Sequence, residues 1–189
     1  MNFQSSNIVP DFLQNEDIAR LESIGKYVFL KRNETFIEQG TKNKNLFFIL
    51  KGTLRGYYID EEGTEKDIFL PPENAIAGAP DSLFKDEITQ YNFMAIEESV
   101  VFGIDIDVLE EIGYENPRIM RFYLMHLKKA FSTVIRRMQE LIAEKPEKRY
   151  QSLHINRPDL VKNAKKKYLA TFIGVTPNSL SRIRKKTEN

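Results

Sequence analysis

The feature that most constrains the fold is a change of hydrophobic period at Asn116-Pro117. Before it, from Lys26 to Ile106, short apolar and β-branched runs alternate with turn residues, a spacing typical of antiparallel sandwiches and small barrels. After it, apolar residues recur at steps of three and four, which is the period of a helix. We therefore expect an α+β chain in which an antiparallel β-sandwich or small β-barrel precedes a helical part. The expected strands are residues 27–30, 35–37, 46–50, 54–59, 66–70, 91–96 and 100–104, with a hairpin turn at 60–63 and a short helix at 11–25.

The segment that begins at Asn116-Pro117 predicts a long helix with a narrow apolar seam. The seam residues are Met120, Leu124, Leu127, Phe131, Val134, Met138 and Leu141. Their alternating steps match the a and d positions of a coiled coil, whereas a helix packed on its own core usually has a wider apolar stripe. We favour a parallel homodimer over the alternative that this helix only covers its own barrel. Glu144-Lys145-Pro146 ends the helix and predicts a hinge.

Residues 166–186 predict two short helices joined by a tight turn. Gly174 lies where the turn between two helices favours a positive φ, Thr176 can cap the second helix, and Pro177 suits its first position. The outer face of the second helix is polar and basic. This combination is typical of a helix-turn-helix that reads the major groove of DNA, and the alternative is an ordinary helical hairpin with a solvated face.

The expected second helix divides into two sets of candidate DNA contacts. Asn178, Ser179 and Arg182 lie toward its N-terminal half on the outer face, where side chains reach base edges. The candidate phosphate contacts lie at the turn or toward the C-terminal end, and they are Thr176, Ser181, Arg184, Lys185 and Lys186. Arg182 suits guanine and Asn178 suits adenine by their hydrogen-bonding patterns.

Charge is distributed unevenly along the chain. Residues 144–189 hold twelve Lys or Arg against four Asp or Glu, whereas residues 1–143 hold sixteen against twenty-three. A polyanion such as DNA is therefore expected to meet the C-terminal part alone.

The composition argues against several classes of function. The chain has no cysteine, which excludes disulfides, thiolate metal sites and cysteine nucleophiles. Its two histidines, His126 and His154, lie outside the β-region, so we expect no metal site, no catalytic residues and no cofactor. No apolar run is long enough to span a bilayer and no signal-peptide pattern is present, so we expect a cytoplasmic protein without a membrane partner.

The order of these parts resembles the Crp/Fnr family of bacterial transcription regulators. The stretches that carry the resemblance are FIEQG (36–40), NLFFILKG (45–52), Gly63, GVTP (174–177) and SRIR (181–184). The resemblance covers nearly the whole chain and implies an antiparallel, jelly-roll-like β-barrel of the cyclic-nucleotide-binding type, followed by a long dimerisation helix and a C-terminal helix-turn-helix domain.

The chain departs from the family pattern in its second half. Family members that bind cyclic nucleotides carry a Gly-Glu pair for the ribose and an Arg-Ser/Thr-Ala triplet for the phosphate. The stretches that match them, 75–80 and 89–92, contain no such carboxylate and no arginine. A buried phosphodiester needs a compensating cation, so we expect no control by cAMP. The candidate effector pocket is then Ala77, Gly78, Ala79, Gln90, Tyr91 and Asn92.

The C-terminal part departs from the family as well. Many members begin the recognition helix with Arg-Glu, where this chain has Pro177-Asn178, so the usual operator is not expected. The sequence ends at Asn189, and we expect no β-wing after the recognition helix.

Together these features predict three domains: a sensor barrel (1–116), a dimerisation helix (117–144) and a helix-turn-helix domain (145–189). The expected function is that of a homodimeric, non-enzymatic transcription regulator that binds a near-palindromic operator in double-stranded DNA. RNA polymerase and an unidentified small-molecule effector are further candidate partners. Two alternatives stay open: a constitutive DNA binder whose barrel is only a scaffold, and a cupin-like ligand-binding module.

Overall fold

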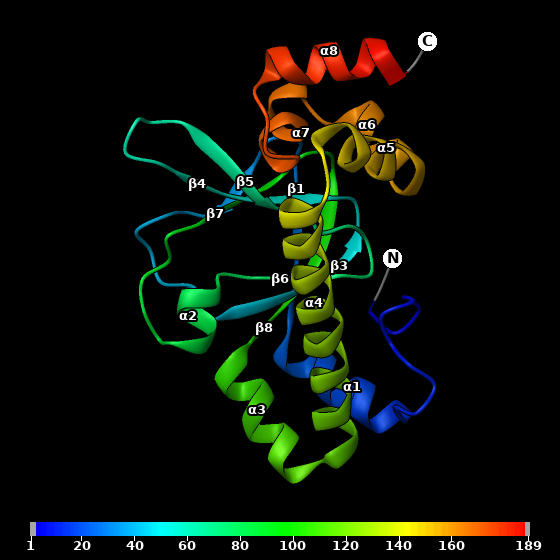
Figure 1. The fold of residues 1–189 in the computed structure, drawn as a ribbon. Coiled ribbons are helices and arrows are strands. Elements are labelled where there is room, and N and C mark those ends of the chain that lie inside the picture. Colours follow the sequence, from blue (N-terminus) through cyan, green and yellow to red (C-terminus); the bar gives the residue numbers. More distant parts are fainter. Residues whose placement is uncertain (1–2, 188–189) are drawn as a thin grey trace.

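The computed structural model describes residues 3–187, in which two small β-sheets are followed by a long helix and a group of short helices (Figure 1). The expected sensor and reader domains begin at Met1 and end at Asn189, which lie outside the described residues. The elements are α1 (Asn15–Ile24), β1 (Lys26–Leu30), β2 (Thr35–Ile37), β3 (Asn45–Lys51), β4 (Leu54–Ile59), β5 (Glu65–Phe69), β6 (Ile76–Ala77), α2 (Pro80–Phe84), β7 (Asn92–Ala95), β8 (Ser99–Asp105), α3 (Ile106–Glu115), α4 (Pro117–Ala143), α5 (Pro146–Asn156), α6 (Pro158–Asn163), α7 (Lys166–Phe172) and α8 (Pro177–Thr187).

The strands form two four-stranded antiparallel sheets, which confirms the antiparallel prediction. The first sheet has the order β1-β8-β3-β6 and the second has the order β2-β7-β4-β5. The two sheets are not joined into a closed barrel, so the expected barrel is corrected to a two-sheet β-roll. The edge strands explain this, because β6 has two residues and β2 has three, too few to bridge from one sheet to the other.

Four short elements were absent from the sequence expectations: β6, α2, α3 and α6. The largest of them, α3, follows β8 without a Gly or Pro between them. Its N-cap is Asp105, whose carboxylate accepts hydrogen bonds from the amides of Asp107 and Val108. Pro158 ends α5, as expected, and it is also the first residue of α6, a position that proline favours.

Three apolar clusters hold the fold together. The outer face of the first sheet packs against α1, α3 and the first half of α4, where Phe48, Phe102 and Phe122 are buried. The space between the two sheets is filled by a second cluster that includes Phe47 and Phe93. The outer face of the second sheet packs against α5–α8 through a third cluster. The C-terminal helices therefore pack directly on the second sheet (Figure 1).

The two halves of α4 have different environments. In the first half Ile119, Phe122 and Tyr123 are buried against the sheet. His126 is buried too, and its Nε2 donates to the carbonyl of Ile8 at 3.1 Å. Burial lowers the pKa of His126 to about 4. In the second half the apolar side chains project into solvent.

Candidate nucleic-acid interface and effector pocket

Helices α7 and α8 form the expected helix-turn-helix. Gly174, between them, has φ = 76°, a conformation that glycine adopts without strain. Thr176 caps α8, since its Oγ1 accepts a hydrogen bond from the amide of Ser179 at 3.2 Å. The amide of Val175 bonds to the carbonyl of Ala170 at 2.9 Å and closes the turn. The structure thus confirms the predicted turn at Gly174 and the predicted cap at Thr176.

Helix α8 lies at one end of the molecule, beyond α7 as seen from the sheets (Figure 1). Leu180 and Ile183 are buried on one face of this helix. Of the candidate DNA contacts, Thr176, Asn178, Arg182, Lys185 and Lys186 are exposed, whereas Ser179, Ser181 and Arg184 are half-buried. A groove of about 300 Å³ between α5 and α8 is bordered by Ser179, Arg182 and Lys186. Two of the three base-reading candidates, Ser179 and Arg182, therefore border this groove, and Asn178 does not.

Arg149 connects the hinge to the helix-turn-helix, a role that the sequence did not indicate. Its side chain is buried, its Nε donates to the carbonyl of Ile173 at 2.9 Å, and its Nη1 donates to the carbonyl of Glu144. Ile173 and Glu144 are the C-cap residues of α7 and α4, so Arg149 caps the C-terminal ends of both helices. In a basic segment, nothing in the sequence distinguishes such an arginine from one that contacts phosphate.

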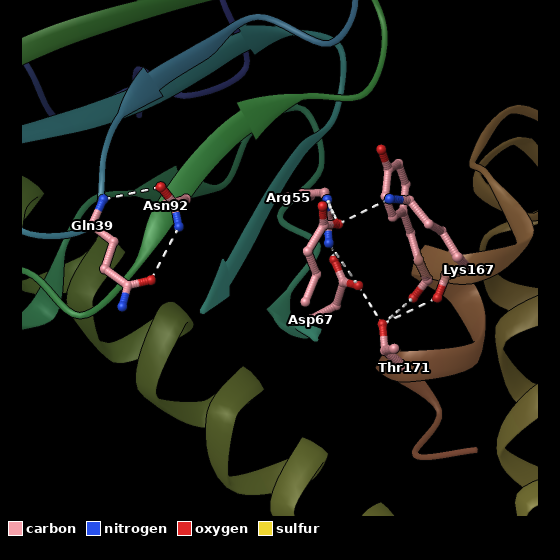
Figure 2. Close-up of polar contacts among 8 residues, drawn as sticks. Gln39, Arg55, Asp67, Asn92, Lys167 and Thr171 are labelled. Carbon is pink, nitrogen blue, oxygen red and sulfur yellow. Dashed lines mark hydrogen bonds and ion pairs between the residues drawn. The ribbon is translucent and has the colours of Figure 1, made fainter. Parts of the chain in front are cut away.

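A second unexpected arginine, Arg55, joins α7 to the second sheet (Figure 2). The Arg55 side chain, on β4, is 1% exposed, and its guanidinium lies between the rings of Tyr57 and Tyr168, 3.8 and 3.7 Å from their centroids. The same guanidinium binds the Asp67 carboxylate through Nε, and also through Nη2 at 3.1 Å. The hydroxyl of Thr171, on α7, donates to Oδ2 of Asp67, the same oxygen that accepts from Nη2 of Arg55.

Glu65 lies at the edge of this contact and interacts with a residue of β4 and a residue of α7. Its carboxylate accepts from Nη1 of Arg55 at 2.8 Å and lies 3.2 Å from Nζ of Lys167, on α7. Burial acts to raise the pKa of Glu65, but the hydrogen bonds and positive charges of Arg55 and Lys167 together outweigh burial, and the pKa is lowered. Burial raises the pKa of Asp67, and the hydrogen bond from Arg55 opposes that rise. Helix α7 and the second sheet therefore meet through a charged contact that apolar side chains surround.

The six candidate effector-pocket residues do not converge on one cavity. Ala77 and Ala79 are buried between the sheets, and a Cβ on Gly78 would lie 2.6 Å from Leu83. Gln90 is exposed, and its backbone amide donates to the carboxylate of Asp81 at 3.0 Å. Asn92 points to the outer face of the second sheet, where its side-chain oxygen accepts from the amide of Gln39 at 3.0 Å (Figure 2). Tyr91 is half-buried.

The space between the sheets is filled by aromatic rings. Phe36 and Phe47 meet edge to face at 5.0 Å between centroids, and Phe69 contacts both Tyr91 and Phe93. The buried arginines in residues 3–187 are Arg55 and Arg149, and both lie outside this space. The interior is apolar and offers no cation to a phosphate.

A shallow groove of about 700 Å³ lies on the outer face of the second sheet. Its lining includes Tyr57, Asn92 and Glu38. Of the six candidate effector-pocket residues, Asn92 lines this groove and the other five do not.

Within residues 3–187, no group of three or more His, Asp or Glu side chains is placed to hold a metal ion. Over the same residues, no helix has the length and apolar character that crossing a membrane requires.

Comparisons with known proteins agree with this architecture. Residues 27–115 match the family model described as the cyclic nucleotide-binding domain. CLP, a c-di-GMP-responsive global regulator from Xanthomonas campestris, superposes with a TM-score of 0.73 at 14% identity, covering 93% of this chain and 92% of that one. FixK2 from Bradyrhizobium japonicum gives 0.72 at 11% identity, covering 87% and 85%. A Crp/Fnr-family transcriptional regulator from Thermus thermophilus gives 0.68 at 15% identity, covering 86% of each chain. A search of curated proteins finds no match.

Proposed function

Because residues 27–115 belong to the cyclic nucleotide-binding domain family and the chain has the fold of Crp/Fnr transcription regulators, we propose that this protein is a homodimeric, DNA-binding transcription regulator. The observation that carries the proposal is the outer face of α8, where exposed Asn178 and Arg182 stand beside Lys185 and Lys186. Such a helix enters the major groove with its N-terminal residues at base edges and its basic end at phosphates.

The exposed seam of α4 supports the homodimer. Leu124, Phe131, Val134, Met138 and Leu141 are between 42% and 67% exposed, although all five are large and apolar. An apolar stripe of this length on the surface of a chain indicates a surface that another protein covers. A second copy, aligned in parallel, covers it with the same residues. The two α8 helices then bind half-sites about one helical turn apart on a near-palindrome.

Each of the three parts of the chain has its own role in this proposal. Residues 1–116 serve as the sensor, 117–144 as the dimerisation helix and 145–189 as the reader, with the hinge at Pro146. RNA polymerase is the further partner that a transcription regulator implies.

Control by cAMP is disfavoured by the structure of the roll. The interior is packed with aromatic rings, and the residues that match the family's phosphate-binding stretch include no arginine. A constitutive DNA binder, in which the roll is a scaffold, is the second candidate, and this filled interior is the observation that favours it. Among residues 3–187, no cluster of His, Asp and Glu is placed to support metal-dependent catalysis.

Selection of bound sequences from a random DNA pool tests the proposal. Wild-type protein should enrich a palindromic motif, and the Asn178→Ala/Arg182→Ala variant should lose that enrichment while it stays dimeric. Lys129→Ala removes a positive charge from α4, far from α8, and should leave the motif unchanged. Repeating the selection with a metabolite extract separates a sensor from a constitutive binder, because only a sensor changes its affinity. Absence of any enriched motif for the wild type would contradict the proposal.

A further inference from the structure

The contact between α7 and the sensor sheet engages a lysine that lies in the expected DNA-binding part of the chain. We infer that Lys167 is a DNA-phosphate contact which Glu65 of the sensor masks, while the Arg55–Asp67 pair holds α7 in the masked position. The inference rests on the proposed DNA-binding function and assigns a regulatory contact to it.

The position of Lys167 suits a phosphate contact. It lies in the first turn of α7, next to Lys165 and Lys166, and all three side chains are exposed. The first helix of a helix-turn-helix crosses the DNA backbone, and lysines at such a place bind phosphate oxygens. In this structure, however, Nζ of Lys167 lies 3.2 Å from the carboxylate of Glu65.

A carboxylate and a phosphate compete for the same ammonium group. Both are anions that accept hydrogen bonds from it. The Lys167 ammonium therefore cannot keep its ion pair with Glu65 and also neutralise a phosphate. Glu65 also brings a negative charge to the surface that DNA would approach. As long as α7 stays docked, the reader therefore lacks one phosphate contact in each subunit.

The Arg55–Asp67 pair determines how firmly α7 stays docked. The two side chains are each 1% exposed, and two elements of the sensor supply them, β4 and β5. The reader contributes the ring of Tyr168 on one side of the guanidinium and the hydroxyl of Thr171 on the Asp67 carboxylate. Leaving a buried charge without these partners is unfavourable, so undocking requires that water or other groups replace them.

Two further hydrogen bonds join the domains away from this pair. Nη2 of Arg32 donates to the carbonyl of Asn163 at 3.1 Å, and Nη1 of Arg157 donates to the carbonyl of Leu70 at 3.2 Å. They flank α6 and keep the reader oriented on the sheet. The masked position is thus a specific docking geometry with contacts along several elements.

The primary test compares Glu65→Gln with Glu62→Gln. Both variants remove one carboxylate from the same hairpin, but Glu62 is exposed at the turn and Glu65 contacts Lys167. Arg55 keeps its partner Asp67 in both. We expect Glu65→Gln to bind the selected operator several-fold more tightly than Glu62→Gln. The slope of log affinity against log salt should steepen by about 0.9 per subunit, the value for one added phosphate contact.

A second measurement tests the docking without DNA. Thr171→Val keeps the shape of the side chain and removes the hydroxyl that donates to Asp67. Backbone hydrogen exchange in residues 166–172 should become about tenfold faster in this variant, whereas exchange in β3 should stay as in the wild type. Unchanged exchange in α7 would show that the contact does not hold the reader.

The outcomes separate this inference from the proposed function. If Glu65→Gln and Glu62→Gln bind DNA with equal affinity and salt slope, or if Glu65→Gln binds more weakly, the masking is wrong while DNA binding stands. If no variant and no wild-type protein selects DNA, the proposed function is wrong and the masking with it, and the exchange data then describe only a structural contact.

Discussion

Replacing Phe131 with aspartate should dissociate the homodimer. Phe131 lies in the middle of the α4 seam and is 67% exposed in the isolated chain. In a parallel coiled coil a residue at this position faces the same residue of the partner. The substitution therefore removes two facing rings and places two carboxylates against each other.

The magnitude follows from the exposed share of the ring. Complete burial of a phenylalanine side chain stabilises by about 3 kcal/mol at most, so the exposed two-thirds corresponds to about 2 kcal/mol per subunit. Two subunits lose about 4 kcal/mol, before any repulsion between the carboxylates. Because each 1.4 kcal/mol changes an equilibrium constant about tenfold, the dissociation constant should rise roughly a thousandfold.

Sedimentation equilibrium over a range of protein concentrations measures this constant. Ser132→Asp is the matched control, because it introduces the same carboxylate one residue along the helix, on an exposed face outside the seam. The circular dichroism of both variants should match the wild type, since neither side chain contributes to the buried core. A dissociation constant for Phe131→Asp equal to that of Ser132→Asp would refute the seam, as would a wild-type protein that is monomeric throughout.

Three other predictions concern the reader, the roll and the N-terminal contact. Arg182→Ala should relax preference at one base position by about 1–3 kcal/mol, whereas Lys186→Ala should weaken all sequences alike and flatten the salt slope by about 0.9 per subunit; uniform effects from both would contradict these roles. Calorimetry with cAMP or cGMP should show no micromolar binding, because a missing arginine costs roughly 2–5 kcal/mol, and a micromolar Kd would overturn the expectation. The stability of the wild type should fall as pH decreases from 6.5 to about 4, since burial lowers the pKa of folded His126 and the unfolded chain therefore takes up the proton first. This contribution approaches about 3 kcal/mol, and His126→Gln, which keeps a donor for Ile8, should lose it in urea titrations at several pH values; identical pH profiles would exclude it.

The elements predicted correctly are those with short-range causes. The turn at Gly174, the cap at Thr176 and the first position at Pro177 act on their immediate neighbours, so their effect is visible in the order of residues. The start of α4 at Pro117 was visible for the same reason. The helix α3 was missed although its cap and apolar spacing are present, because it follows β8 with no Gly or Pro to mark the boundary.

The periodicity of α4 predicted its apolar seam, but Met120 and Leu127 of that seam pack partly against the cluster under the first sheet, so which half of the helix is covered depended on the sheets. Ile119 and Phe122 lie beside the seam in the sequence pattern, and they are buried because α4 lies across the first sheet there. Farther along, Val134 and Met138 continue the seam and are 45% and 51% exposed. Only the length of the sheet decides where one environment changes into the other.

The sequence by itself determined the order of the parts: a β-domain, a long helix with an apolar seam, and a helix-turn-helix with a basic outer face. Tertiary structure alone decided that the roll is filled and that the reader is docked on it. Arg55 and Asp67 are separated by more than a hundred residues from Tyr168 and Thr171. Such a contact arises from how strands and helices fold back on one another, and a charged residue in a strand has the same local pattern whether it meets solvent or a buried partner.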